Sequence, residues 1–307
     1  MRFALYGAGR MAPIHAAAIV GGQGQVVGLL DPNRTDPLVV DDRPVQAVAD
    51  LDGLLDLDPD AILVATPTGD HARSIELIAG IAPGTRIIVE KPVATSAEDY
   101  RSAMDAADAN ACPVSVLLHA AHAPEVQWAQ DLLTTWQDEH GLIRRSTSRF
   151  CDPYGAPADD ARRASLVSSW IDSGINLLSV LDRFLDVTKT EPVDSIPPFE
   201  HLARGTARFS GTEPFPVTMI TSWRAIEPSK STVLDFEDGA QLILDHQAVA
   251  GWLLTPRGQA THYRLENAAP RLAEHYRRMF KEEAATDWRP HRDLDDRLHK
   301  LLFAGRG

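Results

Sequence analysis

The sequence predicts an α/β protein in two parts, a doubly wound parallel sheet followed by an α+β domain with a mostly antiparallel open sheet. Its 307 residues are about twice the length of an average domain. The first third alternates short apolar runs with helical patterns, which is typical of βαβ units. Later runs of β character are joined by a hairpin signal, as in an antiparallel sheet. We therefore expect one domain over residues 1–118 and a second over residues 119–307.

Buried parallel strands and intervening helices are expected along the first domain. Five runs rich in aliphatic residues are the candidate strands: Phe3–Tyr6, Gln25–Leu30, Ala61–Ala65, Arg86–Glu90 and Val114–Leu118. Four helical stretches lie between them: Met11–Val20, Ala47–Leu55, Asp70–Ile81 and Ala97–Ala111. Most of these strands are continuous apolar runs, as expected when helices cover both faces of the sheet.

The second domain is expected to begin with a helix near Pro124–Gln137 and a strand over Leu142–Phe150. An irregular segment, residues 151–160, precedes a helix from about Ser168 to Leu185. The remaining runs of β character are Ala203–Phe209, Val217–Trp223, Ser231–Phe236 and Ala240–Asp245, and the last helical stretches are Arg271–Glu283 and Asp293–Phe303. Asp238-Gly239 predicts a hairpin, because this pair favours the positive φ angles of a tight turn.

Charge and composition exclude several classes of protein. Acidic residues exceed basic ones, which gives a formal net charge of −13, and no cluster of Lys and Arg offsets it. Because such a surface repels phosphate backbones and anionic headgroups, we expect neither nucleic acid nor membrane partners. The N-terminal strand leads directly into a Gly-rich turn without an apolar leader core, which favours the cytoplasm. The two cysteines, Cys112 and Cys151, form no CxxC pair, so structural thiols are expected and no metal site.

A Gly-rich turn follows the first strand at Gly7-Ala8-Gly9-Arg10-Met11-Ala12 and fits the pattern G-x-G-x-x-A. In this pattern Gly7 permits the tight turn, Gly9 lets the backbone approach a pyrophosphate, and Ala12 allows the helix to pack closely on the sheet. The helix that starts near Arg10 and Met11 offers N–H groups and a positive dipole end to the phosphates. Strand, turn and helix together predict a Rossmann dinucleotide site rather than a merely structural turn.

The acidic residue Asp31 ends the second strand, 19 residues after Ala12. A carboxylate at this place accepts hydrogen bonds from a ribose 2′-hydroxyl and repels the 2′-phosphate of NADP, so NAD is favoured. Arg34 leaves NADP open, because an arginine here is able to pair with that phosphate; the alternative is a solvated turn residue.

Two further segments follow the next strands, Ala65-Thr66-Pro67-Thr68-Gly69-Asp70-His71 and Val89-Glu90-Lys91-Pro92. With them the chain resembles the glucose-fructose oxidoreductase and inositol dehydrogenase family, written Gfo/Idh/MocA, in the order of elements over nearly its whole length. The resemblance implies that the Glu90-Lys91-Pro92 turn lies at the nicotinamide, where Lys91 touches the reacting oxygen of the substrate. Thr66 and Pro67 are expected near the nicotinamide ribose. His71 matches a histidine common in the family, and its alternative is a partly buried capping side chain.

The position of Lys91 supports such a role on physical grounds. Ligands of open α/β sheets bind beyond the carboxyl ends of the strands, and Lys91 comes directly after such an end. An ammonium group beside a substrate oxygen stabilises a developing alkoxide and is able to pass a proton. Pro92 restricts the turn and makes a cis Lys-Pro bond a reasonable expectation. The alternative is an ordinary surface Lys-Pro loop.

The second domain departs from the family pattern, which usually carries Asp-x-x-x-His on a helix. The corresponding residues here are Asp172 and Asn176, whose spacing of four still puts them on one helical face. An amide does not exchange a proton near neutral pH, whereas an imidazole does. We therefore expect Asn176 to orient a substrate hydroxyl while Lys91, assisted by Asp172, handles the proton.

A second departure lies at His119-Ala120-Ala121-His122-Ala123-Pro124, where relatives often show Asn-x-Arg-Phe-x-Pro. The arginine position is Ala121, so an anion contact from that side chain is missing. His119 is a candidate substrate-binding residue, and its alternative is a hinge histidine. The HxxH spacing is a minimal metal pattern, but no third ligand accompanies it in the sequence, so we expect no metal. Asp152 and Tyr154 lie in a candidate substrate loop, residues 149–160, or in an ordinary polar loop.

Taken with the resemblance, these residues favour an NAD(P)-dependent oxidoreductase that moves hydride between nicotinamide and a carbinol or ketone carbon. The resemblance implies a sugar, polyol or related small molecule as substrate, and a homo-oligomer, either dimer or tetramer. Two alternatives stay open. One is NAD-dependent glycosidase-type chemistry on the same fold, and the other is a non-catalytic nucleotide sensor or assembly protein with a decayed site, motivated by Asn176 and Ala121.

Overall fold

A computed structural model describes residues 1–34, 37–40, 42–209, 212–258, 260–265, 271–284 and 291–304. The chain forms two compact units. The first contains Met1–His119 together with Leu272–His299, and the second contains Ala120–Arg271 and the residues from Lys300 on. The sequence suggests a single boundary after residue 118, whereas the later segment Leu272–His299 returns to the first unit.

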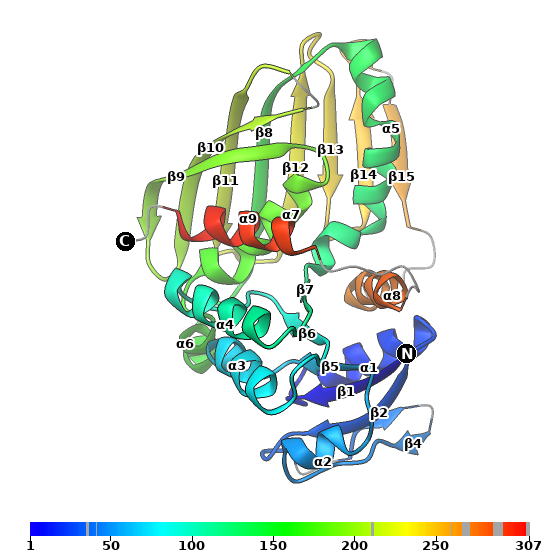
Figure 1. The fold of residues 1–307 in the computed structure, drawn as a ribbon. Coiled ribbons are helices and arrows are strands. Elements are labelled where there is room, and N and C mark those ends of the chain that lie inside the picture. The colour runs from blue at the N-terminus through cyan, green and yellow to red at the C-terminus, as the bar shows by residue number, and fades with distance from the viewer. Residues whose placement is uncertain are drawn as a thin grey trace. The chain divides into compact units, whose positions relative to one another are not determined.

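The first unit is built on a parallel sheet of five strands in the order β2-β1-β5-β6-β7 (Figure 1). The strands are β1 (Arg2–Tyr6), β2 (Gln25–Leu30), β5 (Ala61–Val64), β6 (Ile87–Glu90) and β7 (Val114–Leu117). Each lies within one residue of the run expected from the sequence. Because the chain leaves β1 for β2 on one side and later reaches β5 on the other, the sheet has a switch point beyond the ends of β1 and β5.

Helices flank this sheet, and most of them match the expected stretches. They are α1 (Ala12–Gly21), α2 (Leu51–Leu55), α3 (His71–Ile81), α4 (Ala97–Ala109), α8 (Arg271–Glu283) and α9 (Arg292–Phe303). Two short strands, β3 (Val39–Val40) and β4 (Arg43–Pro44), form a separate pair. The helix expected from Ala47 begins only at Leu51, because Ala47 bridges to Leu29 and Asp50 caps the helix by accepting a hydrogen bond from Gly53 N–H.

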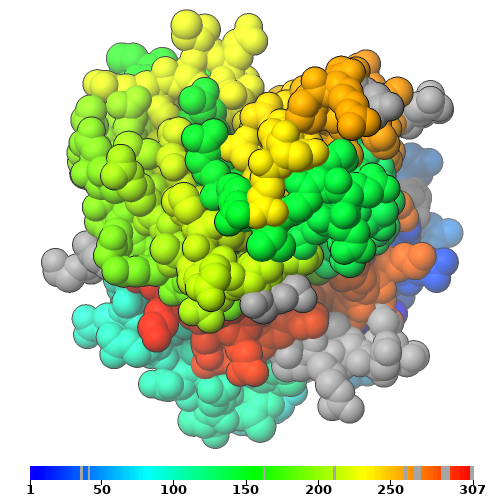
Figure 2. All heavy atoms as spheres, turned by 90° about the horizontal axis from the view of Figure 1, so that it is seen from above, coloured from blue at the N-terminus to red at the C-terminus, as the bar shows by residue number. Residues whose placement is uncertain are grey.

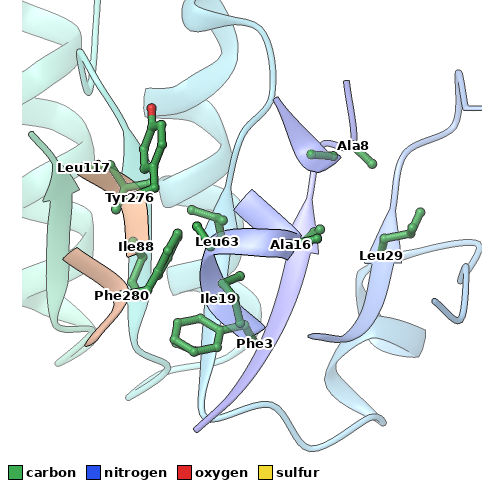
Figure 3. Packing of buried hydrophobic residues seen from close by; sticks show 14 of the residues in the cluster. Phe3, Ala8, Ala16, Ile19, Leu29, Leu63, Ile88, Leu117, Tyr276 and Phe280 are labelled. Atoms are coloured by element: carbon green, nitrogen blue, oxygen red, sulfur yellow. The ribbon is translucent and has the colours of Figure 1, made fainter. Parts of the chain in front are cut away.

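Helix α8 contributes to the core of the first unit although it follows β15 by sequence. Tyr276 and Phe280 on α8 point into an apolar cluster with Phe3 on β1 and Ile19 on α1 (Figure 3). The rings of Phe3 and Phe280 meet edge to face with centroids 5.5 Å apart. Burial of these side chains holds the late segment on the same face of the sheet as α1.

The second unit contains an eight-stranded sheet in the order β15-β14-β13-β12-β8-β11-β10-β9. Its strands are β8 (Ile143–Cys151), β9 (Asp186–Ile196), β10 (Glu200–Arg208), β11 (Phe215–Ser222), β12 (Ser229–Phe236), β13 (Gln241–Asp245), β14 (Ala250–Leu254) and β15 (Ala260–Arg264). All neighbours are antiparallel except β8 and β11. The fold class expected from the sequence is therefore confirmed.

Helices α5 (Pro124–His140) and α7 (Ile175–Asp182) pack on this sheet. In the space-filling view, α5 (green) lies beside the yellow and orange strands β13 to β15 (Figure 2). The predicted hairpin at Gly239 joins β12 to β13, with Gly239 at φ +90°. The expected helix 168–185 is instead a π-helical turn, η4 (Trp170–Gly174), that leads into α7.

Other elements of the second unit differ from the sequence expectation. Strands β9, β14 and β15 were not expected. Part of the irregular segment is helical, with η3 (Pro157–Asp159) followed by α6 (Asp160–Leu166). Strand β9 lies at the edge of the sheet, and because most of its residues are polar and exposed, its sequence has little apolar signal.

Both cysteines, Cys112 and Cys151, are buried free thiols, as expected. Among the described residues, no group of three or more His, Cys, Asp or Glu side chains is arranged to hold a metal ion. Within the same residues, every helix is too short or too polar to span a bilayer.

Candidate active site

The Gly-rich turn lies at the switch point of the first sheet. Gly7 adopts φ +90°, and its N–H donates to the carbonyl of Leu30 at 2.9 Å. A Cβ atom at Gly7 would lie 2.5 Å from the backbone nitrogen of Thr66. The loop after β1 therefore abuts the loop after β5, and only glycine fits both the conformation and the space.

Gly9 has the opposite environment. It is exposed, and a Cβ atom built on it would meet nothing within 4 Å among the described residues. Helix α1 begins beside it without a side-chain cap, with Met11 half-buried at the N-cap and Arg10 exposed. The first N–H groups of α1 thus lack a side-chain acceptor, next to open space at Gly9. This arrangement fits a pyrophosphate.

Asp31 stabilises the same turn through its carboxylate. One oxygen accepts a hydrogen bond from Ala8 N–H at 2.8 Å and the other from Asn33 N–H at 2.9 Å. Arg34 is half-buried and donates to the carbonyl of Ala8 at 2.6 Å, so it is not a solvated turn residue. Both side chains hold the Gly-rich turn in the conformation described above.

His71 connects the loops that follow β5 and β6. Its ring nitrogens lie 2.9 Å from the carbonyl oxygen of Thr66 and 2.8 Å from that of Pro92. Burial lowers the pKa of His71 below its ordinary value, although both carbonyls oppose this effect. Pro67 is exposed at the end of the first of these loops, and the Lys91-Pro92 peptide bond is cis.

Glu90 anchors the Lys91 turn from inside the first unit. One carboxylate oxygen accepts a hydrogen bond from Tyr276 O–H at 2.5 Å and lies 3.0 Å from His15 Nε2, while the other accepts from Lys91 N–H at 3.1 Å. Burial opposes ionisation of this carboxyl, yet His15, Tyr276 and the charge of Lys91 outweigh it and hold the pKa of Glu90 below its ordinary value. The bond from Lys91 N–H to Glu90 therefore fixes the backbone at Lys91, whose side chain is half-buried.

His119 belongs to the first unit and is 7% exposed. Its ring packs on Tyr276 with centroids 4.9 Å apart, and its Nδ1 lies 3.4 Å from Nδ1 of His275. These contacts place it in the polar network that ends at Glu90. Tyr276 and His275 come from α8, so the sequence motifs gave no sign that they contact the loops after β6 and β7.

Asp172 and Asn176 lie in the second unit at the junction of η4 and α7. Both are buried, at 9% and 7% exposure. Among the described residues, no donor reaches Oδ1 of Asn176. A buried amide oxygen without a donor costs free energy, so this atom is available to a ligand hydroxyl.

Lys230 is a neighbour of these residues that sequence reasoning missed. Its Nζ lies 3.0 Å from Oδ1 of Asp152, and Ser173 O–H donates to the other carboxylate oxygen at 3.3 Å. Lys230 sits near the start of β12, where a lysine ordinarily indicates an exposed strand end. Only the pairing of Lys230 with Phe150 on β8 brings it beside Asp152, and no local pattern reveals that pairing.

Comparisons with known proteins identify a family with an NAD-binding Rossmann fold. Residues 1–118 match the model of an oxidoreductase family with an NAD-binding Rossmann fold, GFO_IDH_MocA. The rhizopine catabolism protein MocA of Rhizobium meliloti is 26% identical over 63% of this chain and 59% of that protein. Inositol 2-dehydrogenase of Rhizobium meliloti strain 1021 is 26% identical over 53% of this chain and 49% of that protein.

A solved structure shows the same fold over almost the whole chain. An Agrobacterium radiobacter oxidoreductase in complex with NAD+, L-tartaric acid and magnesium covers 99% of this chain and 94% of its own at a TM-score of 0.75 and 15% identity. The matched regions span 59% and 49% of the lengths of these two curated relatives. The resemblance to the Gfo/Idh/MocA family inferred from the motifs is confirmed.

Proposed function

We propose that this chain, an oxidoreductase-family protein with an NAD-binding Rossmann fold, transfers hydride between nicotinamide and a carbinol or ketone carbon of a sugar, polyol or related small molecule. The observation that carries the proposal is the open space at Gly9 beside the uncapped start of α1, in the same unit as the Lys91 turn. Bound NAD would supply the hydride acceptor.

The residues of the first unit suit this cofactor. The pyrophosphate would be held by Gly7, Gly9, Arg10 and Met11. The remaining lone pairs of the Asp31 carboxylate would accept a hydrogen bond from a ribose hydroxyl. Asp31 favours NAD because its carboxylate would repel a 2′-phosphate, whereas Arg34, whose bond to the Ala8 carbonyl uses one of its five N–H donors, leaves NADP open. Thr66, Pro67, His71 and Glu90 would shape the nicotinamide end.

Lys91 would act on the reacting oxygen. In the oxidation direction its neutral amine would take the hydroxyl proton as hydride leaves the carbon, and in the reduction direction its ammonium group would stabilise the developing alkoxide and return that proton. In the second unit, Asn176 Oδ1 would accept a hydrogen bond from a substrate hydroxyl, and Asp172 would accept another. His119 is proposed as a substrate-side residue on the first unit.

Binding and turnover test the proposal together. Titration with NAD and with NADP, followed by tryptophan fluorescence, should show saturable binding with NAD the tighter ligand. A panel of sugars, polyols and hydroxy acids should then include at least one compound that reduces the bound cofactor. Failure of both nucleotides to bind would contradict the proposal. Binding without turnover of any compound would favour a nucleotide-binding protein without activity.

We also propose a cytoplasmic protein that assembles with copies of itself. Both buried thiols are free, which agrees with a reducing compartment. Cell fractionation and light scattering are the direct measurements, and a secreted or monomeric protein would contradict these two points.

A further inference from the structure

The second unit contains a buried charged cluster that extends the Asp172–Asn176 region. Lys230 has only 13% of its side chain exposed and its partner Asp152 has 8%. The charges of Arg271 and Asp172 also act on Lys230, so groups from β12, the segment after β8, η4 and the start of α8 converge here. An ion pair held this deep needs further polar contacts to offset its desolvation.

The charges in this cluster are unequal. Asp152 and Asp172 act on Lys230, whereas Asp152, Glu125 and Asp245 act on Arg271, together with Tyr154. Among the described residues that these interactions name, four carboxylates therefore face two cations. A carboxylate-bearing ligand would add to the negative excess and find Lys230 already paired with Asp152, whereas an uncharged ligand would add no charge.

Among the described residues around this cluster, two buried acceptor atoms lack a donor. Among the described residues, no donor reaches Oδ1 of Asn176 or Oε2 of Glu125. Glu125 is fully buried, and its other oxygen lies 2.8 Å from His246 Nδ1. A ligand that satisfies these two atoms must bring hydrogen-bond donors, which hydroxyl groups supply and carboxylates lack.

We propose that Lys230, held by Asp152, is a substrate-specificity residue, and that the cluster selects uncharged polyhydroxy ligands over carboxylate-bearing ones. The ammonium of Lys230 donates to a ligand hydroxyl oxygen, while Asp172 and Asn176 accept from ligand hydroxyls. This inference rests on the proposed function for its general substrate class and narrows that class by charge.

The protonation of Lys230 is part of the inference. Burial lowers the pKa of Lys230 below its ordinary value and the charge of Arg271 adds to this, while Asp152 and Asp172 oppose it. Ligand affinity should therefore fall as rising pH removes the ammonium proton. That loss should occur at a lower pH than the titration of an exposed lysine.

The sequence contains five lysines, which makes a direct measurement practical. The wild-type protein labelled with ε-13C-lysine should give five resolved signals, and Lys230→Arg identifies the one from Lys230. We expect this signal to titrate at lower pH than that of Lys189, whose side chain is 61% exposed. Inositol or glucose should shift the Lys230 signal and leave the Lys189 signal in place, and glucuronate should have no effect.

Kinetics of matched variants provide the second measurement. Lys230→Met should raise the KM for a neutral polyol substrate about tenfold or more, with kcat within about threefold and NAD affinity unchanged. Lys230→Arg should retain part of the affinity, and Lys189→Met should match the wild type. Because Lys230→Met leaves Asp152 without its cation, Lys230→Met/Asp152→Asn serves as the variant without an unpaired buried charge.

The two proposals fail in different ways. If no neutral polyol shifts the Lys230 signal of the wild-type protein, or if glucuronate shifts it equally, this inference is overturned even when hydride transfer occurs. If inositol or glucose shifts the signal but no compound is oxidised, the binding inference stands and the proposed function fails.

Discussion

The two units place their chemistry in different ways. In the first, the Gly-rich turn and the Glu90-Lys91-Pro92 turn are short continuous segments of sequence, held in place by side chains such as those of Asp31 and Glu90. In the second, Lys230, Asp152 and Asp172 come from separate elements and meet only through strand pairing and helix packing. The proposed cofactor site therefore rests on local motifs, whereas the proposed substrate site rests on side chains that the fold of the second unit brings together.

Removal of the Lys91 side chain should have the largest effect on turnover. It tests whether hydride transfer depends on this residue of the first unit. Lys91→Ala should lower kcat about 10²–10⁴-fold, because charge stabilisation and proton transfer at the substrate oxygen are lost. NAD affinity and thermal stability should change little. Stopped-flow measurement of cofactor reduction on an identified substrate would reveal this loss, and turnover equal to the wild type would exclude Lys91 from the reaction.

The two glycines of the turn should respond differently if backbone geometry makes the nucleotide site. Gly7→Ala forces a side chain into φ +90° and against Thr66, so the free energy of unfolding should fall by about 3–4 kcal/mol. Gly9→Ala meets open space, so it should fold normally but weaken NAD binding about tenfold or more. Urea unfolding and calorimetric titration separate the two effects. Equal stability losses for both variants would contradict this account of the turn.

His299 tests whether the late segment belongs to the first unit. It is fully buried, its Nε2 accepts a hydrogen bond from Val93 N–H at 3.3 Å, and burial lowers its pKa to about 4. The unfolded chain, with an ordinary histidine pKa near 6.5, binds more protons between pH 6.5 and 4. The stabilising effect is therefore complete above pH 6.5, and about 3 kcal/mol is lost as the pH falls to 4.

The matched variants are His299→Gln and, at an exposed position, His262→Gln. Chemical denaturation at a series of pH values should show a flatter stability curve for His299→Gln alone. If His299→Gln and His262→Gln follow the same pH dependence as the wild type, then His299 is not the buried neutral group described here.

Removal of the Tyr276 hydroxyl should cost less stability than Gly7→Ala, and it tests whether α8 holds Glu90 in place. Tyr276→Phe removes the hydrogen bond to Glu90 and should cost about 2 kcal/mol of stability, since the acceptor is a carboxylate. It should also raise the pKa of Glu90 towards its ordinary value. A double-mutant cycle with Glu90→Gln, measured by urea unfolding, should show coupling between the two positions, and additive effects would rule out a direct interaction.

The fold of the first unit could largely be predicted from the sequence because its signals are local. Continuous aliphatic runs mark its five strands to within one residue, and the Gly-rich turn follows the first of them. The return of α8 to this unit was not predictable, because its amphipathic pattern shows that it packs but not on which partner. Strands β14 and β15 were missed for a related reason, since their stability comes from pairing with neighbours.

The site shows the same division. Gly7, Gly9, Glu90 and Lys91 were identified from motifs of two to six adjacent residues. Lys230, His15 and Tyr276 carry no local signal, because each acquires its role from a contact with a residue far away in the sequence. Asn176 could be named because it matches the histidine position of the family's Asp-x-x-x-His pattern, but its lack of a donor among the described residues required the structure.

The central claim is that the chain moves hydride between nicotinamide and a carbinol carbon, and isotope transfer tests it most directly. The protein with NAD would be incubated with neutral polyols deuterated at their carbinol carbons, and the reduced nicotinamide would be analysed by mass spectrometry. The account predicts that the reduced cofactor carries one deuterium from the substrate carbon, and that Lys91→Ala strongly slows its appearance. Reduced cofactor without deuterium, or no reduced cofactor with any polyol despite NAD binding, would contradict it.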